Sequence, residues 1–203
     1  DFASKLLGLY EQQIQNFIVD IQNKKKLKNF INIGCGDGYH ALGLIKNNFF
    51  DTAICYEISP EARDILKINL KENNIEKNFI VHKAASFEKI KDDLKKIKIE
   101  ETLFLIDIEG NEFELLANED LNFINQGYLI IEDHNFLIND NELKKNFYSN
   151  IKNNFHFELI HNGSRNPFEI DNDFFNNLND DSRFLLLGEG RPKKMSWIFL
   201  SPK

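Results

Sequence analysis

The chain has 203 residues, of which 42% are hydrophobic and 28% charged, and its formal net charge at neutral pH is −7. This length and composition predict one globular domain over residues 1–203, and a homodimer is compatible with them. The negative charge argues against nonspecific binding to nucleic acid or to a membrane surface, because both need basic surfaces. No apolar stretch approaches the ~20 residues of a membrane span. Two cysteines without a CxxC spacing, Cys35 and Cys55, indicate a reducing cytoplasm.

A leading helix is expected within residues 1–28. Between Ser4 and Asn23 the apolar positions recur at helical spacing, at Leu6, Leu7, Tyr10, Ile14, Phe17, Ile18 and Ile21. Such spacing predicts one helix that packs beside a sheet. The basic run from Lys24 to Lys28 is interpreted as the solvated end of this helix and not as a phosphate site, because lysines suit the helix dipole there.

Residues 30–39 read Phe-Ile-Asn-Ile-Gly-Cys-Gly-Asp-Gly-Tyr, a buried strand that runs into a glycine-rich turn. Gly34, Gly36 and Gly38 allow positive φ angles and let a ligand approach the backbone closely. A turn of this kind opens a helix whose N-terminus faces a cleft, which predicts a nucleotide-like or carboxylate-bearing ligand. Tyr39 stands where the dinucleotide fingerprint GxGxxG needs glycine, and the P-loop ending Gly-Lys-Ser/Thr is absent.

Strands and helices alternate after this turn. Further strands are expected at Thr52–Glu57, Phe79–Ala84, Thr102–Asp107, Tyr128–Ile131, Phe155–Ile160 and Trp197–Leu200. The alternation predicts an α/β fold with a mostly parallel, seven-stranded central sheet and helices on both faces. Only a weak helical segment, Asp171 to Leu178, separates the last two strands, so we expect that pair to be antiparallel. Residues 29–135 would form the ligand-binding core, and residues 136–203 would complete the sheet on the substrate side.

Glu57 closes the second strand, where a carboxylate can accept both hydroxyls of a ribose. The alternative is a merely tight glycine turn with a solvated glutamate. The chain resembles the class I S-adenosyl-L-methionine (SAM)-dependent methyltransferases in three features taken together. These are Asn-Ile-Gly-Cys-Gly-Asp-Gly at 32–38, Glu57 after the second strand, and Ala84-Ala85 after the third strand. The resemblance covers most of the chain from Phe30 onward and implies their Rossmann-like fold.

That resemblance implies SAM as the cofactor. The residues that it places around the cofactor are Asn32, Gly34, Cys35, Gly36, Gly38, Tyr39, Glu57, Ile58, Ala84, Ala85 and Asp107. Asn32 departs from the pattern, because most class I enzymes begin this motif with an acidic residue. An asparagine cannot attract the ammonium group of the cofactor as a charge.

Two later segments resemble the FkbM-type methyltransferases. Residues 105–116 read Leu-Ile-Asp-Ile-Glu-Gly-Asn-Glu-Phe-Glu-Leu-Leu and are similar to the Asp-x-Glu-Gly-x-Glu signature of that family. Residues 130–135 read Ile-Ile-Glu-Asp-His-Asn and are similar to its Ile-Glu-x-His segment. The resemblance implies O-methylation of a hydroxyl on a small polar acceptor, such as a sugar, a nucleotide sugar or a surface-polysaccharide precursor. The alternatives are N- or carboxyl-methylation of another small molecule and a non-catalytic SAM-binding protein.

The candidate catalytic residues are His134, Asp107 and Glu132. Methyl transfer from a sulfonium needs a close in-line acceptor and a group that removes its proton. In an open parallel sheet the reaction site lies beyond the carboxyl ends of the strands, where these three residues fall. His134 is the candidate general base because its unperturbed pKa is about 6.5. The alternative is a histidine that merely bonds a neighbouring loop.

The same acidic residues suggest a metal site, which we do not predict. Asp107 with Glu132 or Asp133 would suit Mg²⁺ and would lower the pKa of a coordinated hydroxyl. Acids at 109–112 also have a simpler interpretation as caps of the next helix. The candidate substrate residues are Glu109, His134, Asn135, Arg165, Arg191 and Tyr10. Arginine forks bind phosphate or carboxylate, although a surface salt bridge is the alternative for each.

Overall fold

The computed structural model describes residues 2–161, 166, 168 and 170–203. Arg165, one of the candidate substrate residues, lies outside these described residues. No helix in the described ranges is both long enough and apolar enough to cross a membrane.

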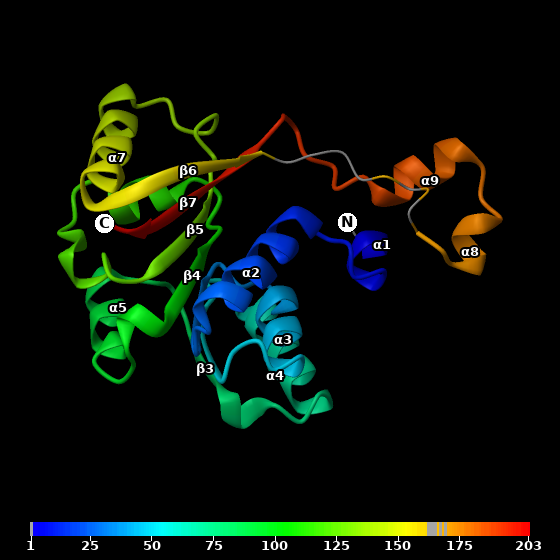
Figure 1. The fold of residues 1–203 in the computed structure, drawn as a ribbon, viewed down its shortest axis with the longest axis horizontal. Helices are drawn as coiled ribbons and strands as arrows, with labels where there is room; N and C mark the ends of the chain where they lie inside the picture. Colours follow the sequence, from blue (N-terminus) through cyan, green and yellow to red (C-terminus); the bar gives the residue numbers. More distant parts are fainter. Residues whose placement is uncertain (1, 162–165, 167, 169) are drawn as a thin grey trace.

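The centre of the fold is a sheet of seven strands, counted over the described residues, in the order β3-β2-β1-β4-β5-β7-β6 (Figure 1). The strands are β1 Asn29–Ile33, β2 Thr52–Tyr56, β3 Phe79–His82, β4 Thr102–Ile106, β5 Tyr128–Glu132, β6 Phe155–His161 and β7 Ser196–Pro202. Strands β1 to β5 are parallel, and β7 runs antiparallel to both β5 and β6. The prediction of a mostly parallel sheet with an antiparallel last pair is confirmed.

Helices cover both faces of this sheet (Figure 1). Their bounds are α1 Phe2–Leu6, α2 Gln12–Lys25, α3 Tyr39–Lys46, α4 Pro60–Glu72, α5 Phe87–Leu94, α6 Asn111–Leu116, α7 Asn141–Asn154, α8 Asp173–Asn176 and α9 Asp180–Leu187. Buried residues of α2, α3 and α4 pack on one face of the sheet, and those of α5, α6 and α7 pack on the other. Strands β1 and β4 are buried along their whole length, which explains why both are nearly continuous apolar runs.

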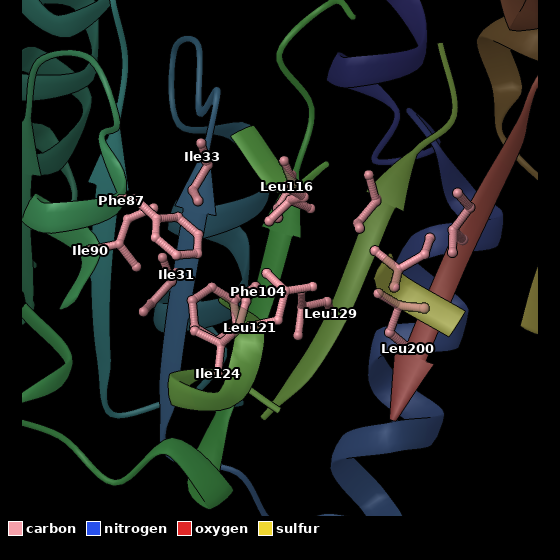
Figure 2. Packing of buried hydrophobic residues seen from close by; sticks show 14 of the residues in the cluster. Ile31, Ile33, Phe87, Ile90, Phe104, Leu116, Leu121, Ile124, Leu129 and Leu200 are labelled. Carbon is pink, nitrogen blue, oxygen red and sulfur yellow. The ribbon is translucent and has the colours of Figure 1, made fainter. Parts of the chain in front are cut away.

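Figure 2 shows the core on the second face. Ile31 of β1 and Phe104 of β4 lie side by side and pack with Phe87 and Ile90 of α5. Burying side chains of this size stabilises the fold by roughly 1.5–3 kcal/mol each. The carboxyl ends of the two strands are therefore held rigidly, and they carry the glycine turn and Asp107.

The prediction of one continuous leading helix is wrong. The chain forms α1 and α2, and residues 7–11 turn between them. Gly8 (φ 71°) and Glu11 (φ 50°) are left-handed, and the backbone N–H groups of Leu9 and Tyr10 both donate to the carbonyl of Ser4. A left-handed residue cannot continue a right-handed helix. The break turns Tyr10 and Glu11 toward the carboxyl ends of the strands.

The segment between β6 and β7 also differs from the expectation of one weak helix at 171–178. Its described residues form two helices, α8 and α9, which project beyond the sheet near α1 (Figure 1). Asn172 and Asn179 cap them by accepting the backbone N–H groups of Phe174 and Ser182. The element α9 contacts α1, so the two segments that flank the core meet on the same side of the molecule.

Candidate functional site

The glycine turn joins the carboxyl ends of three strands. The N–H groups of Gly34 and Cys35 donate to the carbonyl of Tyr56 at 2.8 and 3.1 Å. Gly34 has φ 84°, and a Cβ there would lie 1.7 Å from the carbonyl oxygen of Asp107. Only glycine permits this approach of β1 to β4. Gly36 also has a positive φ, but nothing lies within 4 Å of its would-be Cβ, so its backbone faces open space.

A cavity of about 750 Å³ opens beside this turn. Its walls come from the carboxyl ends of β1, β2, β3 and β4 and from α5 and α6. The predicted cofactor residues that line it are Gly34, Gly36, Glu57, Ile58, Ala84, Ala85 and Asp107, and the candidate substrate residue Glu109 also lines it. Seven of the eleven predicted cofactor residues therefore line this cavity.

Four predicted cofactor residues are not among the lining residues. The amide of Asn32 is buried within the sheet and donates to the carbonyl of Leu105 at 3.4 Å. Cys35 is a buried free thiol, and Gly38 packs against the side chains of Leu42 and Leu66. The ring of Tyr39 packs edge-on against Tyr10 with centroids 5.5 Å apart. These residues support the turn from behind.

Glu57 holds the turn in place. One carboxylate oxygen accepts the N–H of Gly36 and the other accepts the N–H of Ser59, each at 2.8 Å. A carboxylate has about four acceptor sites, so both oxygens can still receive a ligand hydroxyl.

His134 lies just beyond the end of β5 and is only 2% exposed. Its Nδ1 is 3.1 Å from Oε1 of Glu112, and the same oxygen accepts the backbone N–H of His134 at 3.2 Å. The other oxygen of Glu112 accepts the N–H of Gly110 at 2.9 Å. A carboxylate only accepts, so Nδ1 carries a proton and Nε2 is the ring nitrogen that can bind one.

Glu112 has a role that sequence reasoning did not assign. It stands in the segment similar to the Asp-x-Glu-Gly-x-Glu signature and among the acids interpreted as helix caps, but it is not one of the candidate site residues. Its side chain is fully buried. The available signal was its position four residues before Leu116, on the face that α6 buries. A carboxylate on a buried helix face needs a partner, and His134 is that partner.

Nε2 of His134 faces three further carboxylates. It lies 3.4 Å from Glu109, 3.4 Å from Glu132 and 3.9 Å from Oδ1 of Asp107. Within the described ranges, the buried Oδ1 of Asp107 has no hydrogen-bond partner.

Burial and neighbouring charges shift the pKa values of His134 and Asp107. Burial tends to lower the pKa of His134, but the hydrogen bond and charge of Glu112, with the charges of Glu132 and Glu109, outweigh it and raise that pKa. Burial, reinforced by the charge of Glu132, raises the pKa of Asp107 well above its usual range. Both groups therefore hold a proton more strongly than they would in water.

Arg191 closes the cluster from the loop before β7. Its guanidinium binds Glu11 and Glu189 at 2.9 Å each and also donates to Glu132. Glu11 in turn pairs with His40 at 2.7 Å. The predicted substrate residue Arg191 is thus engaged by three carboxylates.

Tyr10, another predicted substrate residue, lies beside the same acids. Burial raises its pKa, and the charges of Glu11, Asp107 and Glu132 raise it further. Residues near the two ends of the chain therefore meet over the carboxyl ends of β4 and β5.

Asp133 and Asn135 point elsewhere. Both oxygens of Asp133 accept the hydroxyl of Tyr148, at 2.8 and 2.9 Å, and Asn135 bonds the same carboxylate. Ligand atoms of Asp107, Glu109 and His134 lie within 4.8 Å of one another, as do those of Glu11, Asp107 and Glu132. Of the two candidate metal pairs, the fold brings Asp107 together with Glu132.

Solved methyltransferases are similar to this chain over nearly its whole length. An O-methyltransferase from Bacillus cereus, solved in complex with S-adenosyl-homocysteine (SAH), has a TM-score of 0.61 and 13% identity, covering 95% of this chain and 81% of that one. TomG from Streptomyces achromogenes, an O-methyltransferase solved with SAM, has a TM-score of 0.59 and 10% identity, covering 98% and 79%. The precorrin-6y C5,15-methyltransferase from Geobacter metallireducens has a TM-score of 0.52 and 11% identity, covering 93% and 88%.

The chain has the Rossmann-like fold of these methyltransferases. No protein-family model and no curated protein matches its sequence. At such low identities the methyltransferase fold is established and the activity is not. The activity is inferred from the site, because one fold can carry many functions.

Proposed function

We propose that the chain is a SAM-dependent methyltransferase that transfers a methyl group to a hydroxyl of a small polar acceptor. The observation that carries this proposal is the buried His134, which Glu112 orients so that Nε2 faces the acids beside the cavity. A positioned base next to a nucleotide-sized cavity is what alcohol methylation requires.

The cavity residues fit SAM in kind. Ala84, Ala85 and Phe87 give an apolar wall suited to an adenine ring, and Glu57 offers acceptors to ribose hydroxyls. The open backbone at Gly36 lets a ligand approach where a side chain would block it. When bound, the cofactor supplies an electrophilic methyl group on a positively charged sulfur.

The residues of the chain supply the rest of the chemistry. Nε2 of His134 accepts the proton of the acceptor hydroxyl, and Glu112 stabilises the imidazolium that forms. Asp107 and Glu132 stabilise the same positive charge from the other side. Tyr10 and Arg191 exclude water from this edge.

We propose membership of the FkbM-like group for a related reason. The residues of this chain that match the letters of its two signature segments are Asp107, Glu109, Glu112, Glu132 and His134. The four acids lie around the ring of His134. Segments that are far apart in sequence thus build one cluster, which supports their reading as a single catalytic unit.

The proposed acceptor is a sugar, free or as part of a nucleotide sugar or surface-polysaccharide precursor. Among these acceptors the occupied guanidinium of Arg191 favours the free sugar, because the phosphates of a nucleotide sugar would have to displace carboxylates to bind it. A cytoplasmic location is supported by the two cysteines, which are buried free thiols.

The test has two stages. Calorimetry should first detect binding of SAM, and methyl transfer from isotope-labelled SAM should then be screened over hydroxylated sugars and nucleotide sugars. His134→Gln should lose turnover and retain SAM affinity. Absence of SAM binding would sink the cofactor proposal, whereas SAM binding without transfer to any acceptor would favour a non-catalytic SAM-binding protein.

A further inference from the structure

The charged side chains that line the cavity are all acidic. Six carboxylates line the cavity, and none of its lining residues is a lysine, arginine or histidine. The six are Glu57, Glu88, Asp107, Glu109, Glu114 and Glu119. Within the described part of the chain, no lysine or arginine forms an ion pair with any of them. Among the described residues, His134 faces Asp107 and Glu109, and Arg63 donates to the backbone carbonyl of Glu57 but does not pair with its carboxylate.

We propose that this acidic wall selects the cofactor by its positive charge and weakens the hold on the product once that charge is gone. The inference rests on the proposed function, because it takes SAM as the ligand. SAM carries a sulfonium, an ammonium and a carboxylate, and its net charge is +1. SAH lacks the sulfonium charge and is neutral overall.

The six carboxylates come from several elements of the cavity wall, and Glu88 is the one on α5. Glu57 follows β2, Asp107 and Glu109 follow β4, and Glu114 and Glu119 lie on α6 and just after it. A cleft with one sign of charge and low-dielectric walls concentrates field lines and attracts the opposite charge. Four of the six are exposed, so the effect of each is small and is screened by salt.

The overall reaction moves the positive charge out of the cavity. A C–O bond to the acceptor forms as the C–S bond breaks with its electron pair left on sulfur, and the hydroxyl proton passes to Nε2 of His134. The charge that began on sulfur therefore ends on the imidazole, which releases the proton to solvent. The carboxylate wall then faces a neutral thioether, and its Coulombic attraction for the cofactor is lost.

Binding measurements on the full chain test this selection. Calorimetry would compare SAM, SAH and sinefungin, in which an ammonium-bearing carbon replaces the methylsulfonium, at low and high sodium chloride. At low salt we expect SAM and sinefungin to bind on the order of tenfold more tightly than SAH. The difference should shrink toward unity at high salt, because exposed charges are screened.

A matched pair of double variants locates the effect. Glu114→Gln with Glu119→Gln removes two negative charges from the rim of the cavity. Glu76→Gln with Glu158→Gln removes two exposed charges from β3's leading turn and from the sheet edge at β6, neither of which lines the cavity. The rim variant should weaken SAM and sinefungin about threefold and leave SAH within twofold. The control variant should leave all three affinities within twofold.

Two outcomes would overturn the inference alone: SAH binding as tightly as SAM and sinefungin at low salt, or equal effects of the rim and control variants. If none of the three ligands binds, the proposed function fails and this inference fails with it. The two failures are therefore distinguishable in one set of titrations.

Discussion

Oε1 of Glu112 binds His134 twice, through the ring Nδ1 at 3.1 Å and through the backbone N–H at 3.2 Å. The double contact fixes both the position and the tautomer of the imidazole, so Glu112 acts as a positioning residue. Its place on α6 and the place of His134 after β5 link two separate segments of the chain into one base.

Glu112→Gln should separate this positioning role from folding. The substitution keeps the shape of the side chain and removes its charge, so turnover should fall by roughly 10- to 100-fold while SAM affinity persists. Since the charge of Glu112 raises the pKa of His134, the acidic limb of the kcat profile, where protonation of this base abolishes activity, should move to lower pH. An unchanged pH profile, measured by initial rates at saturating substrate, would show that Glu112 does not act through His134.

Asp107→Asn should raise the free energy of unfolding and lower the rate of methyl transfer. The raised pKa of Asp107 means that folding disfavours its ionised form, so stability falls progressively as the pH rises from the unfolded pKa of about 4 through the folded pKa. The neutral amide removes this cost and should add about 1 kcal/mol at neutral pH. The gain should vanish as the pH falls below the unfolded pKa of about 4, where Asp107 is protonated in both states.

We would measure thermal unfolding and activity of wild type and Asp107→Asn at several pH values. The variant should be more stable and less active than wild type at neutral pH. A variant that is less stable than wild type at neutral pH would contradict the assignment of Asp107 as a destabilised carboxylate.

Gly34→Ala should be severely destabilising. The new Cβ would lie 1.7 Å from the carbonyl oxygen of Asp107, and the positive φ adds strain, so a loss of at least about 4 kcal/mol is expected. Gly43→Ala is the matched control, because Gly43 lies within α3 with nothing near its would-be Cβ. It should gain roughly 0.5–1 kcal/mol in urea unfolding. Similar results for the two variants would argue against the close contact of β1 with β4.

Arg191→Leu should loosen the N-terminal segment. The change leaves Glu11, Glu132 and Glu189 without their shared cation, at a cost of roughly 3 kcal/mol. Arg191→Lys keeps the positive charge but not the forked guanidinium group, so it should lose less stability than Arg191→Leu. Limited proteolysis should cut near Lys5 faster in Arg191→Leu than in wild type. Lys95→Met, which removes an exposed cation paired with Asp92, should leave the cleavage rate unchanged.

Exhaustive chelation should leave methyl transfer intact. A cation held by Asp107, Glu109 and His134 would occupy the Nε2 lone pair that proton transfer needs. Asp133, the alternative candidate ligand, is bound to Tyr148. Loss of activity after chelation, restored by Mg²⁺, would instead make the acids at the ends of β4 and β5 a metal site.

The sequence predicted the parts of this molecule that depend on local pattern. The apolar runs at β1 and β4 predict buried strands, and the glycines at 34, 36 and 38 predict the turn. Both predictions succeed because each pattern lies within a few consecutive residues. The observed roles of Glu112 and Arg191 were not predicted, because they depend on His134 and Glu132, which lie 22 and 59 residues away. A buried carboxylate and a capping carboxylate look alike until the helix that carries them has been placed.

The break between α1 and α2 was not predicted, for a similar reason. Apolar spacing continues through Gly8, so local periodicity favours one helix. The turn instead brings Glu11 to Arg191, a contact that spans 180 residues. Tertiary pairing overrides local propensity at this point.

The position of β7 between β5 and β6 sets an order for assembly during synthesis. Strand β6 reaches the sheet only through β7, so residues 155–161 have no strand to pair with until residues 196–202 have left the ribosome. Until then the nascent chain exposes the edge of β5, an open template for pairing with other chains. The loop that supplies Arg191 arrives in the same interval, so the ion cluster and the outer half of the sheet are completed together, after the cofactor half has been translated.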